Sequence, residues 1–257
     1  MTNTPATPTV SIITPTYGRE PLLRAVLRSV IRQTLTDFEW LILDDSPQPS
    51  AFFLAVDDRR IRYFHHPGPR LSIGAKRNWL IENARAEIIA QFDDDDYYAP
   101  DYLATMTGWL ERGADLVKLS GWFVYSRAYR ALGYWDLNLK HGLHFIWSAQ
   151  AMAAAVFGEA EAEALATNHL GFGFSYLFRK SVWRQVRFPD QNFDEDGGFI
   201  RAAHAAGCRL HHFADTSGLC LHILHQGNTS RCFPQYLLPS FMFDRYFPPE
   251  ARALLIA

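Results

Sequence analysis

Cysteines, signal-like segments and long apolar runs are scarce in this chain of 257 residues. Its three cysteines are scattered and show no CxxC spacing, which argues against a zinc site or a disulfide framework and favours a reducing compartment. No apolar run reaches the roughly 18 residues that a membrane-spanning helix needs. Residues 1–9 are rich in Thr and Pro and lack the basic-then-apolar pattern of a signal peptide.

Net charge is also close to zero. A formal charge of −2 gives no electrostatic case for binding nucleic acid or an anionic membrane in bulk. We therefore predict a cytoplasmic protein. Peripheral contact with the inner face of the membrane, through the aromatic segment 241–247, stays open as an alternative.

The composition is that of one globular domain. Hydrophobic residues make up 48% and charged residues 20% of the chain. No repeat or low-complexity linker divides it, so residues 1–257 are expected to form a single domain.

Short β-branched strands alternate with amphipathic helices along the first half. This alternation predicts an α/β fold with a mostly parallel, Rossmann-like sheet and helices on both faces. The expected strands are residues 10–13, 38–43, 61–64, 87–92 and 115–120, and the expected helices are 20–34, 73–84 and 100–112.

Polar clusters follow three of these strands, at residues 14–19, 44–46 and 93–96. The carboxyl ends of parallel strands meet at one edge of a sheet, where ligands bind in open α/β folds. These clusters therefore predict one binding site at that edge.

The most informative cluster is the run of four aspartates, Asp93 to Asp96, directly after an apolar strand. Adjacent carboxylates repel one another unless a cation lies among them. Mg²⁺ or Mn²⁺ is the candidate, because either ion is held by one or two carboxylates while a diphosphate supplies further oxygens. A solvated acidic turn or a non-catalytic Ca²⁺ loop is the alternative.

The second half is less regular. We expect a helix over 149–166, a glycine-rich strand over 171–178, a helix over 199–206, a strand over 219–224 and a helical tail over 233–255. Six aromatic residues are equally suited to stacking on sugar rings or to the core: Trp122, Tyr125, Tyr129, Trp135, Trp147 and Phe172.

Four motifs in order resemble those of the family 2 glycosyltransferases of the GT-A fold. The residues that carry the resemblance are Pro15-Thr16-Tyr17-Gly18-Arg19, Leu43-Asp44-Asp45-Ser46, Gly74-Ala75-Lys76-Arg77-Asn78 with Phe92-Asp93-Asp94-Asp95-Asp96, and Asp194-Glu195-Asp196 with Arg201 and Gly207. Gly18 departs from the usual Asn of the first motif. The resemblance covers residues 10–210, and the segment 121–170 matches nothing in the family pattern.

The resemblance implies a metal site at the aspartate run. Asp95 is the expected ligand of Mn²⁺ or Mg²⁺, and Asp93 and Asp94 are expected at the ribose or at a second metal position. A late histidine often completes this site, which makes His225 the first candidate and His222 the second. Asp96 is expected either to orient water or to cap a turn.

The resemblance also implies a nucleotide-sugar site. Asp45 is expected to accept a hydrogen bond from the nucleobase, and either Lys76 or Arg77 is expected to offset phosphate charge. The full set of expected donor-binding residues is Pro15, Thr16, Tyr17, Arg19, Asp45, Lys76, Arg77, Asp93 and Asp94.

Asp196 is the expected general base, with Glu195 as the alternative, because a carboxylate within hydrogen-bond reach suffices to deprotonate an acceptor hydroxyl. The alternative for residues 194–196 is a cap for the helix expected from Phe199.

The chain is thus predicted to be a metal-dependent, inverting glycosyltransferase that uses a nucleotide sugar, most readily a UDP-sugar. Its acceptor would be a glycan, a lipid-linked sugar or a small molecule. Residues 10–120 are expected to form the nucleotide-sugar half, and residues 121–257 the acceptor half with an insertion and the tail.

The non-enzymatic alternative is a nucleotide-sugar or carbohydrate-binding module with the same fold. The sugar, the linkage and the oligomeric state are left open.

Overall fold

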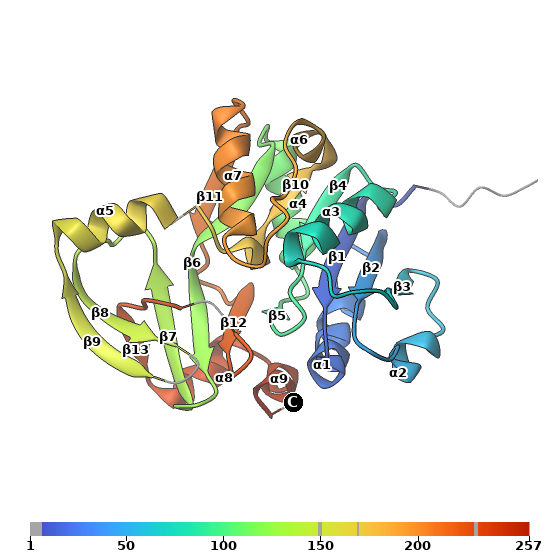
Figure 1. Ribbon diagram of the computed structural model, residues 1–257. Helices are drawn as coiled ribbons and strands as arrows, with labels where there is room; N and C mark the ends of the chain where they lie inside the picture. The colour runs from blue at the N-terminus through green and yellow to red at the C-terminus, as the bar shows by residue number, and fades with distance from the viewer. Residues whose placement is uncertain (1–6, 149–150, 169, 229–230, 257) are drawn as a thin grey trace, which may run out of the picture.

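A curved sheet forms the centre of the computed structural model, which describes residues 7–148, 151–168, 170–228 and 231–256 (Figure 1). Its main path runs in the order β13-β7-β6-β10-β4-β1-β2-β3, and β5, β11 and β12 pair beside this path. The α/β class predicted from the sequence is confirmed.

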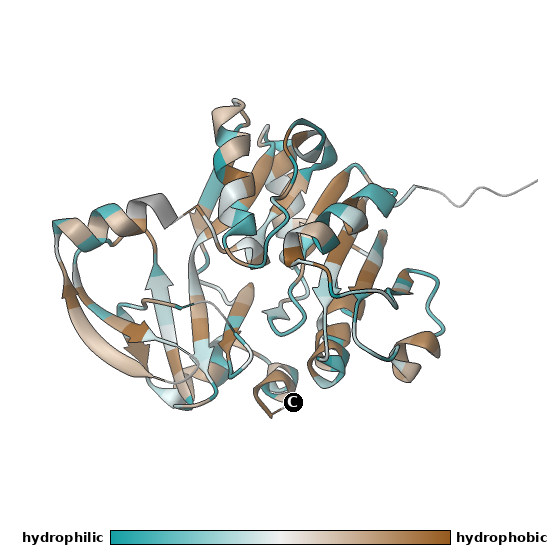
Figure 2. Cartoon of the chain, in the orientation of Figure 1, coloured by the Kyte–Doolittle hydropathy of each residue, from teal (hydrophilic) through white to brown (hydrophobic). Residues whose placement is uncertain are grey.

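The four strands at one end of the sheet are mutually parallel. They are β3 (Ile61–His65), β2 (Phe38–Asp44), β1 (Val10–Thr16) and β4 (Ile88–Gln91). Successive side chains of a strand point to opposite faces. Ile12 accordingly packs in the cluster that contains α1 (Glu20–Ile31), while Ile13 packs in the cluster that contains α3 (Ile73–Asn83). Figure 2 shows this hydrophobic centre as brown strands under more hydrophilic loops.

The rest of the sheet is mixed, so the expected parallel pairing holds only for its first part. β10 (Leu177–Arg179) pairs antiparallel with both β4 and β6 (Leu116–Ser126), and β7 (Ala131–Asp136) pairs antiparallel with β6 and with β13 (Tyr236–Leu238). By contrast, β11 (Leu210–Ala214) and β12 (Cys220–Leu224) run parallel to β6, and β12 also pairs antiparallel with the two-residue β5 (Tyr97–Tyr98).

The predicted helix over 149–166 is wrong in its first half, although residues 149–150 lie outside the described residues. β9 (Met152–Phe157) pairs with β8 (Gly142–Trp147), and α5 (Glu159–Asn168) begins only after Gly158. Strand pairing therefore overrides the helix preference of the alanines in this segment.

Two further predictions fail where glycine and proline interrupt the chain. Residues 173–175 form a 3₁₀ turn before the short β10, instead of one strand over 171–178. The tail 233–255 is divided into β13 and short helices, because prolines at 234, 239, 248 and 249 block a continuous helix.

The remaining helices are short. They are α2 (Ala51–Leu54), α4 (Tyr102–Glu111), α6 (Lys180–Gln185), α7 (Glu195–Ala205), α8 (Phe243–Tyr246) and α9 (Arg252–Ile256). None of the helices in the described ranges combines the length and apolarity that crossing a bilayer requires.

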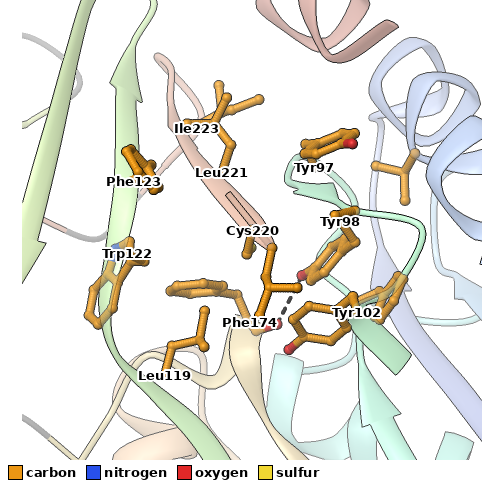
Figure 3. Close-up of a cluster of buried hydrophobic side chains, with 14 of the residues drawn as sticks. Tyr97, Tyr98, Tyr102, Leu119, Trp122, Phe123, Phe174, Cys220, Leu221 and Ile223 are labelled. Carbon is orange, nitrogen blue, oxygen red and sulfur yellow. Dashed lines mark hydrogen bonds between the residues drawn. The ribbon is translucent and has the colours of Figure 1, made fainter. Parts of the chain in front are cut away.

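One buried tyrosine links distant parts of the chain. The Tyr98 hydroxyl donates to the carbonyl of Phe174 at 2.9 Å, drawn as the dashed line in Figure 3, and accepts from the Asp93 backbone N–H at 2.9 Å. The aspartate loop is thereby fixed to the segment that precedes β10.

Candidate active site

A cavity of about 910 Å³ lies at the carboxyl ends of β1 and β4. Its walls come from residues 15–95 and from residues 171–233. The lining residues that the sequence had singled out are Pro15, Thr16, Tyr17, Arg19, Lys76, Arg77, Phe172, Asp93, Asp94, Asp95, Glu195, Asp196 and His222.

The aspartate run forms a compact group of oxygen atoms. Asp93, Asp95 and Asp96 can each offer one carboxylate oxygen, and these atoms lie within 4.8 Å of one another. Mg²⁺ and Mn²⁺ prefer such oxygen donors, so the residues present fit either ion. Asp96 neither caps a turn nor faces water: it is fully buried and accepts from the backbone N–H of Ile223 at 2.9 Å.

Burial and mutual repulsion disfavour the charged forms of Asp93 and Asp94. Burial, together with the neighbouring carboxylates and against the attraction of Arg77, raises the pKa of Asp93 to about 8. Burial and the repulsion of Asp95 likewise raise the pKa of Asp94 to about 6. Asp94 is further held by the Thr16 hydroxyl, which donates to its Oδ2 at 2.6 Å.

The two predicted histidine ligands lie against the aspartates. His225 Nε2 is 2.9 Å from Asp95 Oδ2, and His222 Nδ1 is 2.8 Å from Asp96 Oδ2. Within the described residues, the group of metal-ligating atoms contains the three carboxylates and neither histidine. Their contacts make the histidines partners of the carboxylates, and direct metal ligation by either one stays a prediction.

Asp45 and Lys76 form a buried ion pair, in which Lys76 lines the cavity and Asp45 is not among the residues that line it. Lys76 Nζ donates to Asp45 Oδ1 at 2.7 Å and to the Thr16 carbonyl at 2.9 Å, and the backbone N–H of Leu71 donates to Asp45 Oδ2 at 2.7 Å. Both carboxylate oxygens of Asp45 are therefore engaged within the protein, and its side chain is 0% exposed. Recognition of the nucleobase by Asp45 stays a prediction.

Arg77 connects the aspartate run to α7. It forms a buried ion pair with Glu195 through Nη1, and its Nη2 lies 3.4 Å from Asp93 Oδ1. Glu195 is thus paired with an internal cation, whereas the Asp196 carboxylate accepts hydrogen bonds from the backbone N–H groups of Gly173 and Gly197.

Asp196 stands at the start of α7, which begins at Glu195 and not at Phe199 as predicted. Asp194 precedes it in a left-handed conformation with φ 59° and makes no side-chain cap. The backbone N–H of Gly173 donates to Asp196 Oδ2 at 2.6 Å. A Cβ at Gly173 would lie 2.7 Å from Asp196 Cβ, so only glycine permits this approach.

The structure divides the six aromatic candidates. Trp122, Trp135 and Trp147 are fully buried and belong to the core. Phe172 lines the cavity in a left-handed conformation with φ 69°, a strained geometry that often occurs at functional sites. Tyr125 and Tyr129 are not among the described residues that line it.

Several cavity residues were not identified from the sequence, among them Arg70, Phe193 and Arg231. Arg70 lies with its guanidinium carbon 3.9 Å from the ring centroid of Tyr17, and Phe193 lines the cavity although its side chain is 71% exposed. Arg231 also lines it. Arg70 follows the third parallel strand, and this position at the binding edge was the signal that could have identified it.

Comparisons with known proteins agree with this geometry. The model of the family described as "Glycosyl transferase family 2" matches residues 11–141, just over half of the chain. The colanic acid biosynthesis glycosyl transferase WcaA of Escherichia coli is a putative enzyme by its own description, and it is 35% identical over 103 residues, which cover 38% of this chain and 36% of WcaA.

Two solved structures share the fold at low identity. The first is TarS 1–349 of S. aureus in complex with UDP-GlcNAc, with a TM-score of 0.64 at 17% identity over 86% of this chain and 60% of that one. The second is the mannosyltransferase PcManGT of Pyrobaculum calidifontis in complex with GDP-Man and Mn²⁺, with a TM-score of 0.58 at 17% identity over 87% of this chain and 59% of that one.

The chain spans about a third to just over half the length of the curated relatives it matches. The predicted GT-A fold is confirmed by the structural neighbours, and the predicted glycosyltransferase class by the family match. The family match over more than half of its length shows that this chain belongs to glycosyl transferase family 2.

Proposed function

We propose that the chain transfers one sugar, with inversion at the anomeric carbon, from a nucleoside diphosphate sugar to the hydroxyl group of an acceptor. The observation that carries this proposal is a cavity of about 910 Å³ that is lined by Asp93, Asp94 and Asp95 and also by Asp196. One end of such a cavity suits a cation and a diphosphate, and the other suits a reacting hydroxyl.

The donor would lie against the half formed by residues 10–120. Thr16, Tyr17 and Lys76 line the cavity beside Asp93 and Asp94, which is the environment expected for a base, a ribose and a diphosphate. The ligands named for the two structural neighbours support a nucleotide-sugar donor. UDP is the nucleotide that we favour.

Asp93, Asp95 and Asp96 would hold the metal ion, Mn²⁺ or Mg²⁺, by their carboxylate oxygens. When bound, the ion would act as a Lewis acid that stabilises the negative charge on the departing diphosphate. Arg19 and Lys76, two of the cations that line the cavity, would hold the diphosphate in place.

Asp196 would serve as the base. The acceptor hydroxyl would pass its proton to the Asp196 carboxylate while its oxygen forms the bond to the anomeric carbon, and the bond from that carbon to the diphosphate oxygen breaks. A single displacement without an enzyme nucleophile inverts the anomeric centre. The ion pair of Glu195 with Arg77 supports this choice over Glu195, because it engages the Glu195 carboxylate with an internal cation, even though burial raises the pKa of Glu195.

The acceptor would lie against the half formed by residues 121–257, where Phe172, Phe174 and Phe233 line the cavity. The relative named for colanic acid biosynthesis supports a growing polysaccharide as the acceptor.

The proposal is tested by thermal unfolding of the whole chain with UDP, GDP, UDP-sugars and GDP-sugars, each with Mn²⁺ and with EDTA. We expect one nucleotide to raise the midpoint in Mn²⁺ only, since a ligand at 100 times its Kd stabilises the native state by about 2.7 kcal/mol. That nucleotide names the donor. The absence of any shift across the panel contradicts the proposal, and binding of a nucleotide sugar without turnover on any acceptor favours a binding module instead.

A further inference from the structure

Arg19 is a cation that the fold itself places on the aspartate run. Gly18, with φ 65°, turns the loop after β1, and Arg19 Nη1 then donates to Asp94 Oδ1 at 2.9 Å and to Asp95 Oδ2 at 2.8 Å. Its Nη2 donates to the carbonyl of Gly227 at 2.6 Å. One guanidinium therefore joins the first loop, the aspartates and the loop after β12.

The local environment strengthens this ion pairing. The side chains of Asp94 and Asp95 are 6% and 4% exposed, whereas that of Arg19 is 30% exposed. Burial disfavours the charged guanidinium, but the two carboxylates outweigh it and raise the pKa of Arg19. Arg19 thus already offsets much of the charge that would attract a metal ion.

Asp95 is the most heavily occupied carboxylate of the run. Its Oδ2 atom accepts from Arg19, lies 2.9 Å from His225 Nε2 and 3.5 Å from Asn228 Nδ2. All of these contacts compete with a divalent cation for the electron pairs of one oxygen. Arg19 is the partner among them that carries a permanent charge, and it is exposed enough to face a ligand in the cavity.

We propose that Arg19 is an exchangeable counter-ion that sets the metal affinity of this site and makes it depend on the donor diphosphate. Without nucleotide, the guanidinium neutralises Asp94 and Asp95 and weakens metal binding. A diphosphate in the cavity offers Arg19 a second anionic partner, which leaves the carboxylates more available to the metal. Metal and nucleotide then bind cooperatively, and each raises the affinity for the other by the same factor. This inference rests on the proposed function.

The test is the affinity of the whole chain for Mn²⁺ alone, measured from the electron paramagnetic resonance signal of free Mn²⁺. We expect Arg19→Ala to bind Mn²⁺ about tenfold more tightly than the wild type, because removal of one positive charge strengthens the negative potential at the aspartates. The ratio of the UDP Kd in EDTA to that in Mn²⁺ should fall toward one in the same variant.

Two further variants sharpen the comparison. Arg24→Ala removes an arginine from α1, the helix that follows Arg19, and should leave Mn²⁺ affinity unchanged. Arg24 pairs with Glu20 at the surface, and its side chain is 48% exposed. Arg19→Lys keeps the charge and should retain wild-type Mn²⁺ affinity. Lysine lacks the planar guanidinium that contacts the two aspartates and Gly227 together, so this variant changes the hydrogen-bond geometry and keeps the positive charge. It therefore tests the role of the charge even if Arg19→Ala folds poorly.

Unchanged or weaker binding of Mn²⁺ by a folded Arg19→Ala overturns the inference, and so does a tenfold gain in Arg19→Lys. A wild type that binds Mn²⁺ and UDP independently also overturns it while leaving the proposed function intact. A wild type that binds neither ligand instead contradicts the proposed function itself.

Discussion

Individual carboxylates in this chain differ in role because their partners differ. Glu195 and Asp196 are neighbours in sequence, yet one is paired with the buried Arg77 and the other accepts from the backbone of Gly173 beside the cavity. The sequence could not separate them, since both are acidic and both lie in the same motif. Their partners come from α3 and from the segment before β10, which only folding brings together.

Asp196→Asn should lower transfer by about 10²–10⁴, because an amide cannot take the proton of the acceptor hydroxyl. Binding of UDP with Mn²⁺ should be unchanged, since Asp196 lies on the acceptor side. The measurement is UDP release with an active acceptor, beside calorimetric titration of UDP. The control is Asp194→Asn, which breaks an exposed ion pair with Arg201 and should cost little transfer. Transfer at the wild-type rate in Asp196→Asn would exclude Asp196 as the base.

Lys118 should make the folded state more stable as the pH rises. Burial lowers the pKa of Lys118 to about 7 from its ordinary value of 10.5, despite the nearby Asp196. Between these values the unfolded chain binds more protons than the folded chain, so the free energy of unfolding increases with pH. Lys118→Met should flatten this slope in urea unfolding from pH 7 to 10, whereas Lys140→Met, at a partly exposed site, should not. An equal slope in the wild type and Lys118→Met contradicts the assignment.

At the scale of elements, one buried glutamate ties three parallel strands to the loop before β4. Glu39 on β2 accepts from the Ser11 hydroxyl at 2.7 Å on β1, from Arg62 at 2.8 Å on β3 and from Arg85 Nε at 2.7 Å. Its side chain is 0% exposed. A charge on the buried face of a strand is unusual, and these partners explain why it is tolerated.

Glu39→Gln should destabilise the fold by about 1–3 kcal/mol, because it removes the charge that both arginines face in a buried setting. The loss is smaller than for a fully buried pair, since the side chains of Arg62 and Arg85 are 29% and 37% exposed and water can solvate them. Urea unfolding gives the measurement. Glu87→Gln removes the exposed pair with Arg184 and should cost less than about 1 kcal/mol. An equal loss of unfolding free energy in Glu39→Gln and Glu87→Gln would show that Glu39 does not stabilise the fold by joining these elements.

At the scale of the whole molecule, the cavity exists because two halves of the chain meet across the sheet. Tyr98 is one of the contacts that hold them, since its hydroxyl joins the Asp93 backbone to the Phe174 carbonyl (Figure 3). The wall that carries the aspartates is thus fixed relative to the wall that carries Phe172 and Asp196.

Tyr98→Phe should cost about 1–3 kcal/mol of stability, because it leaves a buried N–H and a buried carbonyl without this partner. It should also weaken UDP binding in Mn²⁺, since Asp93 loses its anchor. The matched control is Tyr102→Phe, whose buried hydroxyl has no described hydrogen-bond partner and should be neutral or stabilising when removed. The measurements are thermal unfolding and UDP titration of both variants. A Tyr98→Phe variant with the same stability and the same UDP affinity as Tyr102→Phe would refute the role of the Tyr98 hydroxyl.

Much of the first half could be predicted from sequence because its signals are local. Alternating apolar segments and turn residues predict the four parallel strands β1, β2, β3 and β4 and the helices α1 and α3. The polar residues that follow three of these strands predicted the binding edge. The second half could not, because its structure depends on distant pairing. β9 is a strand only because β8 lies beside it, and β13 is held by β7.

The sequence by itself determined the family, the α/β class and the acidic edge, because motif order and strand-end chemistry are properties of contiguous residues. Only the tertiary structure decided which charges meet. It paired Arg19 with Asp94 and Asp95, Lys76 with Asp45 and Arg77 with Glu195, all across separations along the chain that no periodicity encodes. The physical reason is that burial makes the energy of a charge depend on its nearest partners in space, and those partners are set by the packing of the sheet.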